Sequence, residues 1–340
     1  MQESRIIKTF GVSAMFVITL GSSCYGSSGP DDRFPFKYQA YSAIEISPDE
    51  RFIVAFIGKD RIFRENWISL FDSEGNRLDA SNCGYRNPRD IVWDASSEYF
   101  LAVNEKEMAC LFQVDDRELV LINQFKYPAD VIIGGGDFSK GHFYVFGKTE
   151  PPGLLDRSSG KLFRLEIGNS SELEELASIE GISSGTVRVV YPSVRTLEDT
   201  LVWRSDCIEE WNLNTETIVN AACRDYAISD YPVVDFIAAS HGEVWGIDMR
   251  DNVFTWDWKH ATLQARFKLD LPLVQLSAHD SGLYALRSID REDGHIRHYS
   301  RDGKVLRTIK APWDNVFCMD LSKNKLAVLS KTGEVFVTDL

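Results

Sequence analysis

The sequence predicts an all-β protein built from repeated antiparallel sheets. A turn of Ser, Asp, Asn or Gly followed by a short apolar strand recurs along the 340-residue chain, and no stretch after the N-terminus shows sustained helical periodicity. Successive copies are 39 to 58 residues apart, which leaves room for about four short strands in each. The recurring strands begin near Phe52, Phe100, Phe143, Leu201, Val244, Leu283 and Leu326.

Each copy is interpreted as one sheet of four strands. An apolar strand precedes the turn, as at 43–46 and 233–237, and a later strand ends in an apolar residue followed by a polar one, as at Phe71-Asp72. One such sheet cannot bury both of its faces alone, whereas seven sheets stacked radially can. We therefore expect a seven-bladed β-propeller with four antiparallel strands per blade, formed as a single domain by residues 34–340.

The last copy supplies only three of its four strands, at 315–321, 325–330 and 334–339. The leftover segment 34–40 is expected to supply the fourth, so that an N-terminal strand closes the last blade. Closure of this kind removes two exposed sheet edges, which would otherwise invite pairing with other chains.

Two third-strand segments resemble the repeats of the WD40-type propeller superfamily: RSDCIEEWN (204–212) and MRDNVFTWD (249–257), with Asp206 and Asp251 at the tight-turn aspartate position. The chain departs from that pattern because no copy has a Gly-His pair before its first strand. Only one aligned Trp-Asp pair occurs, at Trp256-Asp257. The resemblance implies a propeller that serves as a binding platform, and it implies no particular partner.

The N-terminus has the features of a secretory signal peptide. Arg5 and Lys8 precede an apolar run at 10–20, and small residues follow at 21–26, so residues 1–26 are expected to be a processing signal. The apolar run is too short to span a bilayer. Cys24 resembles the lipid-attachment cysteine of bacterial lipoproteins, although Leu20 lies four positions before it instead of three. The protein is therefore predicted to be periplasmic, or anchored to a membrane through a lipidated Cys24, or otherwise secreted.

Five cysteines follow Cys24, and export would permit disulfides between them. Cys207 and Cys223 flank a predicted hairpin and are the first candidate pair. Cys83 and Cys110 are a second, weaker pair. Cys318 lies in an apolar strand and is expected to remain a free thiol, buried as a small core residue.

The charge of the chain bears on its partners. Asp and Glu total 51 against 37 Lys and Arg, which gives a net charge of −14. Such an acidic protein gains nothing from polyanions, so nucleic acids and anionic membrane surfaces are not expected as partners. The sequence favours a monomer that binds a protein partner, with a basic partner suited to the charge.

No motif assigns catalytic, metal-binding or cofactor-binding residues. The six His residues lack metal-ligand spacing, and neither a nucleophile elbow nor a P-loop is present. The residues Glu45, Arg188, Asp235 and Gln275 are polar positions in apolar first strands, and we expect them to face water in a central channel. They define the alternative function, a hydrolase or lactonase acting on a small molecule at that channel.

Three connections are longer than their counterparts, at 58–66, 148–160 and 288–294, and in a propeller they would emerge on one face. Long loops of this kind often carry binding residues. The candidate binding residues are Arg61, Phe63, Arg64, Leu154 and Leu155. The sequence thus favours an exported protein-binding propeller that acts as a scaffold or as an inhibitor of a protein partner in the cell envelope.

Overall fold

The structure is a computed structural model that describes most of the repeated region. The described residues are 22–23, 42–57, 67–84, 88–139, 141–149, 158–167, 173–182, 188–192, 199–204, 207–212, 217–223, 233–238, 243–248, 251–257, 262–269, 273–287, 295–312, 316–330 and 332–340. Within these residues the chain forms strands and no helix, so the all-β prediction is confirmed for them.

The strands of the first four sheets follow each other in chain order, each paired antiparallel with the next. The first sheet contains β1 (Ser22–Ser23), β2 (Ser42–Ile46), β3 (Phe52–Ile57), β4 (Trp67–Asp72) and β5 (Arg77–Asn82). The second contains β6 (Pro88–Trp93), β7 (Tyr99–Asn104), β8 (Met108–Asp115) and β9 (Glu118–Lys126). The third contains β10 (Val131–Ser139), β11 (His142–Thr149), β12 (Ser158–Glu166) and β13 (Glu174–Ile182). The fourth contains β14 (Arg188–Pro192), β15 (Asp199–Arg204), β16 (Cys207–Asn212) and β17 (Thr217–Cys223).

The remaining sheets repeat the same order. The fifth contains β18 (Val233–Ala238), β19 (Glu243–Asp248), β20 (Asn252–Asp257) and β21 (Thr262–Lys268). The sixth contains β22 (Leu273–His279), β23 (Gly282–Arg287), β24 (His295–Tyr299) and β25 (Val305–Lys310). The seventh has three strands in the described part of the chain: β26 (Val316–Leu321), β27 (Lys325–Ser330) and β28 (Val335–Asp339). The segment 34–40, expected to supply its fourth strand, lies outside the described residues.

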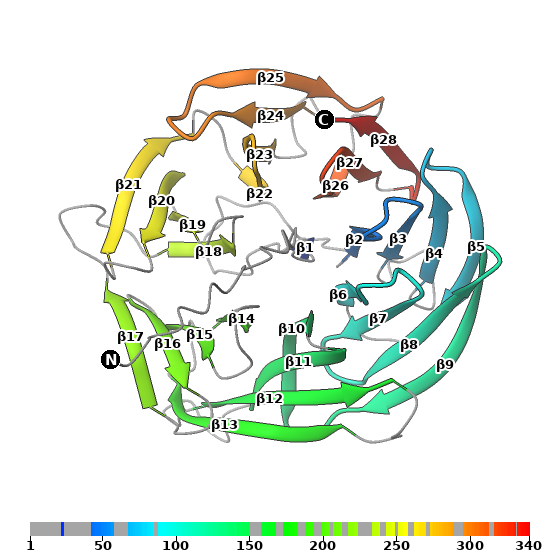
Figure 1. Cartoon of the computed structure of the whole chain (residues 1–340), viewed down its shortest axis with the longest axis horizontal. Coiled ribbons are helices and arrows are strands. Elements are labelled where there is room, and N and C mark those ends of the chain that lie inside the picture. Colours follow the sequence, from blue (N-terminus) through cyan, green and yellow to red (C-terminus); the bar gives the residue numbers. More distant parts are fainter. Residues whose placement is uncertain are drawn as a thin grey trace, which may run out of the picture.

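The sheets are arranged around a common centre, as Figure 1 shows. The strands that begin the repeats, such as β2, β6 and β22, lie nearest the centre, and the strands that end them, such as β9, β13 and β25, lie at the rim. Neighbouring inner strands contact one another from β2 through β6 and β10 to β14, and from β18 through β22 and β26 back to β2. The fourth and fifth sheets meet through β17 and β21. The short strand β1 pairs with β2 on the central side.

The turn that recurs in the sequence has the same hydrogen bond in the first two sheets. Ser47 accepts a hydrogen bond at Oγ from the Phe52 N–H (3.0 Å) before β3, and Asp94 accepts one at Oδ1 from the Tyr99 N–H (2.9 Å) before β7. In both turns one residue adopts a left-handed conformation, Glu50 at φ 60° and Ser97 at φ 62°. These polar residues therefore close the turn between the first and second strands of the first two sheets.

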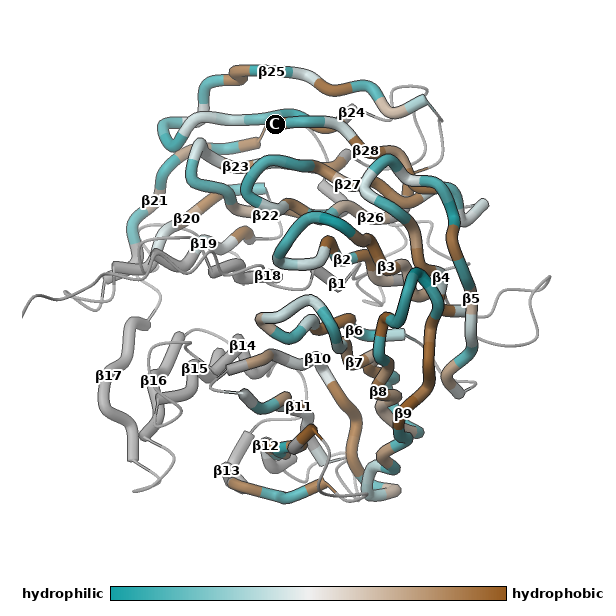
Figure 2. Tube along the Cα trace, turned by 45° about the vertical axis from the view of Figure 1, so that its right-hand side comes forward, coloured by the Kyte–Doolittle hydropathy of each residue, from teal (hydrophilic) through white to brown (hydrophobic). Residues whose placement is uncertain are grey.

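The hydrophobic core lies between neighbouring sheets. Phe56 and Leu70 of the first sheet pack with Trp93 and Phe112 of the second in one cluster. Another cluster joins the first and seventh sheets and includes Ile44, Ile53, Phe71, Ala327 and Leu329. Figure 2 shows the resulting pattern, with apolar stretches in the strands and hydrophilic residues in the turns that join them.

Polar side chains on the inner strands hydrogen bond to the backbone of the next sheet. Asp90 Oδ2 accepts a bond from the Gly136 N–H (3.0 Å), and Asp320 Oδ2 accepts one from the Ile46 N–H (2.8 Å). Gln275 makes two such bonds, because its Oε1 accepts from the Met319 N–H (2.8 Å) and its Nε2 donates to the Met319 carbonyl (2.8 Å). These bonds join the second sheet to the third, the sixth to the seventh, and the seventh to the first.

The prediction that the inner polar residues face water is wrong for the two that can be tested. Gln275 is 5% exposed and Glu45 is 3% exposed. The sheets pack so closely at the centre that the Gln275 amide reaches the backbone of β26 instead of solvent. Arg188 begins β14 and Asp235 lies in β18, both inner strands, but their side chains lie outside the described part.

The pairing of the cysteines differs in part from the sequence prediction. Cys83, just after β5, forms a disulfide with Cys110 in β8, with the Cα atoms 6.0 Å apart, so the weaker predicted pair links the first two sheets. The prediction of a free Cys318 is wrong, because Cys318 is disulfide-bonded and no described cysteine is free. That prediction assumed pairing only among the five cysteines after Cys24. Cys207 and Cys223 are directly opposite in the β16–β17 register, and their side chains lie outside the described part.

Replacing Gln275 tests the inter-sheet bonds. The Gln275→Ala variant leaves both the N–H and the carbonyl of Met319 buried without their partner, and we expect a loss of about 2–4 kcal/mol in the free energy of unfolding. Urea denaturation measures the loss. The exposed Gln124 of β9 provides a matched control, and Gln124→Ala should shift the midpoint little. Equal midpoints for the two variants would contradict a stabilising role for the Gln275 bonds.

Candidate functional site

The loop residues predicted to bind a partner cannot be placed. Arg61, Phe63 and Arg64 belong to the connection between β3 and β4, and Leu154 and Leu155 to that between β11 and β12; all five lie outside the described residues. The third long connection, 288–294, joins β23 to β24 and is likewise outside them. The binding role of these loops therefore stays a prediction.

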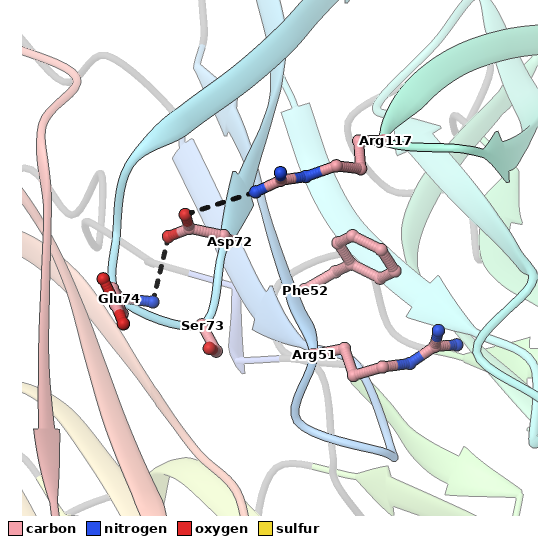
Figure 3. Close-up of a pocket in the computed structure, with 6 residues that line it drawn as sticks. All are labelled: Arg51, Phe52, Asp72, Ser73, Glu74 and Arg117. Carbon is pink, nitrogen blue, oxygen red and sulfur yellow. Dashed lines mark hydrogen bonds and ion pairs between the residues drawn. The ribbon is translucent and has the colours of Figure 1, made fainter.

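A groove that sequence reasoning missed lies where turns of the first and second sheets meet. It encloses about 520 Å³ and is lined by Arg51, Phe52, Asp72, Ser73, Glu74 and Arg117. Figure 3 shows the Phe52 ring between the Arg51 and Arg117 side chains, with the 72–74 turn beside them. The lining residues come from three turns: the one before β3, the one between β4 and β5, and the one between β8 and β9.

Asp72 organises the turn between β4 and β5. Its Oδ1 accepts bonds from the N–H groups of Glu74 (3.0 Å) and Asn76 (2.9 Å), and Gly75 at φ 87° bonds back to the Asp72 carbonyl (3.0 Å). Partial burial raises the pKa of Asp72, but the bonds from Asn76 and Glu74 and the charge of Arg117 outweigh it, so the pKa lies below its usual value. Asp72 is therefore ionised at neutral pH.

Arg117 enters the groove from an unusual turn. Asp116 and Arg117 form the two-residue connection between β8 and β9, with φ of 44° and 76°, whereas Asn-Gly or Asp-Gly usually fills such a turn. Leu119, two residues after Arg117 in β9, donates its N–H to Asp79 Oδ2 of β5 (2.7 Å), which holds this turn against the first sheet. The Arg117 guanidinium then lies with Nη2 3.7 Å from Asp72 Oδ2.

Arg51 and Phe52 form the other side of the groove. The Arg51 guanidinium carbon lies 5.3 Å from the centre of the Phe52 ring, and Arg51 Nε donates to Asp49 Oδ2. Burial raises the pKa of Asp49, but its bonds with Arg51 and Ser47 outweigh this and lower the pKa. The Asp49 N–H also donates to Ser97 Oγ of the second sheet (3.1 Å), so the groove is fixed to both sheets.

The chemistry of the groove suits binding. The side chains of Arg51 and Arg117 are 63% and 61% exposed, so their guanidinium groups are accessible from solvent. A guanidinium stays charged at all physiological pH values and donates hydrogen bonds without transferring protons. The groove thus offers two permanent cations and an aromatic ring to a ligand. Within the described residues, no group of three or more His, Cys, Asp or Glu side chains could hold a metal ion.

A second polar cluster lies in the sixth sheet, around His298. Its ring stacks on Tyr284 with ring centres 4.2 Å apart, and its Nε2 lies 3.2 Å from both the hydroxyl and the carbonyl oxygen of Ser281. The Ser281 hydroxyl also contacts Nδ1 of the exposed His279 (2.7 Å). Burial lowers the pKa of His298, and the nearby charges of His279 and Arg307 lower it further, while the hydrogen bond to the Ser281 carbonyl raises it by less. This cluster closes the turn between β22 and β23.

Comparisons with known proteins give a structural match. No protein-family model matches the chain, and no curated protein matches it. Among solved structures, the β-propeller domain of Cps50 (Swd1) from Myceliophteria thermophila superposes with a TM-score of 0.60 over 90% of this chain and 98% of that one, at 11% identity. The chain has a β-propeller fold, as its resemblance to WD40-type repeats implies. Identity this low shows the fold alone.

The propeller fold does not specify an activity. A total of 1265 chains from solved structures match this chain, and a fold shared this widely supports many functions. In the propeller, the turns that build the groove join first to second and third to fourth strands, at one end of the sheets. The second strands end, and the third strands begin, at the opposite end of the described sheets. In the described residues we find no helix with the length and apolar character of a membrane span.

The His298 cluster predicts a pH dependence of propeller stability. The folded pKa of His298 lies below the unfolded value of about 6.5, so the unfolded chain binds a proton first as the pH falls. The free energy of unfolding should therefore decrease from about pH 6.5 downward until the folded state is also protonated. Urea denaturation at several pH values measures this, and His298→Phe, which keeps the ring stack, should flatten the slope. An unchanged slope in that variant would contradict the prediction.

Proposed function

We propose that the chain is an exported propeller that binds a protein partner, as a scaffold or an inhibitor in the cell envelope. The observation that carries the proposal is the propeller fold, whose described sheets are joined by apolar cores and inner-strand bonds and whose turns form an exposed charged groove. The net charge of −14 favours a basic partner. Features typical of a signal peptide in residues 1–26 and the Cys83–Cys110 disulfide support export.

The proposal includes a ring of seven blades closed by the N-terminal segment. Several rim strands end with an apolar residue followed by Lys, and the next inner strand begins five or six residues after that Lys. The pairs are Phe125-Lys126, Phe267-Lys268 and Ile309-Lys310, followed by inner strands beginning at Val131, Leu273 and Val316. Phe36-Lys37 precedes Ser42, the first residue of β2, by the same spacing. The closing strand is therefore proposed to end at Lys37, slightly before the end of the predicted segment 34–40.

The closing strand can be tested by substitution. Phe36 would take the place in the seventh blade that Phe125, 1% exposed, takes in the second, so Phe36→Ala should lower the free energy of unfolding by about 3 kcal/mol. Lys37→Ser is the matched control, because Lys126 and Lys310 are exposed. Urea denaturation compares the two. If Phe36→Ala behaves like Lys37→Ser, the N-terminal segment does not close the ring in this register.

Partner binding can be tested by capture from the native envelope. The exported protein, purified with its natural N-terminus and immobilised, is exposed to an envelope extract at low and at high salt, and bound proteins are identified by mass spectrometry. We expect one stoichiometric protein whose capture is lost as salt rises, because attraction between exposed charges is screened. Direct titration with that purified protein then gives the affinity. Failure to capture any protein at either salt concentration would contradict the proposal.

A further inference from the structure

We propose that the groove between the first two blades binds a carboxylate group of the protein partner, held by the guanidinium groups of Arg51 and Arg117 beside the Phe52 ring. This inference rests on the proposed function and adds the chemistry of one contact. The carboxylate would belong to an acidic side chain or to the C-terminus of the partner's chain. A guanidinium matches a carboxylate through two parallel hydrogen bonds, which fixes direction as well as charge.

Both guanidinium groups have donors to offer. Arg51 donates to Asp49 through Nε, so this hydrogen bond does not use its two terminal nitrogens. Arg117 lies 3.7 Å from Asp72, which is an ion-pair distance and longer than a hydrogen bond. Both side chains are more than half exposed, so a ligand reaches them without displacing a buried contact.

The left-handed backbone of Arg117 supports a ligand-binding role for its side chain. A non-Gly residue at φ 76° in a two-residue turn costs conformational energy that Gly would avoid. The turn keeps this conformation while Asp79 holds the start of β9 and the charge of Asp72 attracts the guanidinium. The result is a cation fixed beside an aromatic ring, which lowers the entropy cost of binding.

The surrounding charges explain why the groove would accept one carboxylate and the rest of this surface would not. Exposed acidic residues surround it on the turns and strand ends of the first two blades: Asp49, Glu74, Glu98, Asp115, Asp116 and Glu118. They attract a basic partner and repel its carboxylates everywhere except between the two arginines. One acidic group on an otherwise basic surface would thus set the register of the complex.

A cationic ligand fits the groove less well. Arg51 already lies beside the Phe52 ring, where a cation would bind an aromatic face. The Oδ1 atom of Asp72 already accepts bonds from the Glu74 and Asn76 N–H groups. A positive ligand would also meet two positive side chains, whereas a carboxylate meets their donors on the side of the groove away from Asp72 and Glu74.

The groove is tested first with a small probe, 3-phenylpropanoate, which has one carboxylate and one aromatic ring. NMR of the arginine Nε–Hε groups should show saturable shifts for Arg51 and Arg117. The uncharged 3-phenylpropanamide and the cationic 2-phenylethylammonium should produce no such shifts. Arg51→Gln and Arg117→Gln should each weaken probe binding about tenfold, and Arg301→Gln, a turn arginine of the sixth blade, should leave it unchanged. Equal shifts with the amide, or binding of the amine instead, would overturn the proposal.

The second test uses the captured partner. The double variant Arg51→Gln/Arg117→Gln should bind it at least tenfold more weakly, with an unchanged circular dichroism spectrum, and Arg301→Gln should bind it normally. If the double variant loses the probe but keeps full affinity for the partner, the groove is a small-carboxylate site and the inference about the partner is wrong. If no partner is captured, the proposed function fails, while the probe still reports separately on the groove.

Discussion

The packing of each sheet against its neighbours is the constraint on which the rest of this structure depends. A four-stranded sheet with apolar residues on both faces is stable only when both faces are covered, and here the clusters that cover them are shared between adjacent sheets. The inner strands add bonds that apolar packing cannot supply. Asp90, Gln275 and Asp320 each reach the backbone of the next inner strand, which fixes the height of one sheet against the next. Apolar contacts hold the sheets together, and these directional bonds set their register.

The sequence predicted what depends on neighbouring residues and failed where distant segments meet. The turn before each second strand was predictable because Ser47 and Asp94 close it within five residues. The role of Gln275 was not predictable, because its partner Met319 is 44 residues away. The sequence of neither strand shows how close the two inner strands lie. One signal was available: 44 residues is close to the repeat length, so an inner-strand polar residue could have been paired with the same position of the next repeat.

The groove was also not predicted, because its residues are far apart in the sequence. Arg51 and Arg117 lie in different repeats, and only the packing of the first two sheets brings their turns together. A signal existed in the tight connection Asp116-Arg117, where a sequence without Gly occupies two left-handed positions. Likewise, Cys83 and Cys110 were placed second among the candidate pairs because they do not face each other across one hairpin. They instead link the first sheet to the second.

The two walls of the groove belong to different sheets, and this has a thermodynamic consequence. Any ligand that contacts Arg51 and Arg117 together binds only while the first and second sheets keep their native spacing. Ligand binding and the integrity of that inter-sheet contact are therefore thermodynamically linked, and binding stabilises the native arrangement by an amount that rises with the logarithm of the free ligand concentration once this exceeds Kd. The Cys83–Cys110 disulfide spans the same pair of sheets, so a covalent bond and a ligand would restrain the same relative motion from different positions.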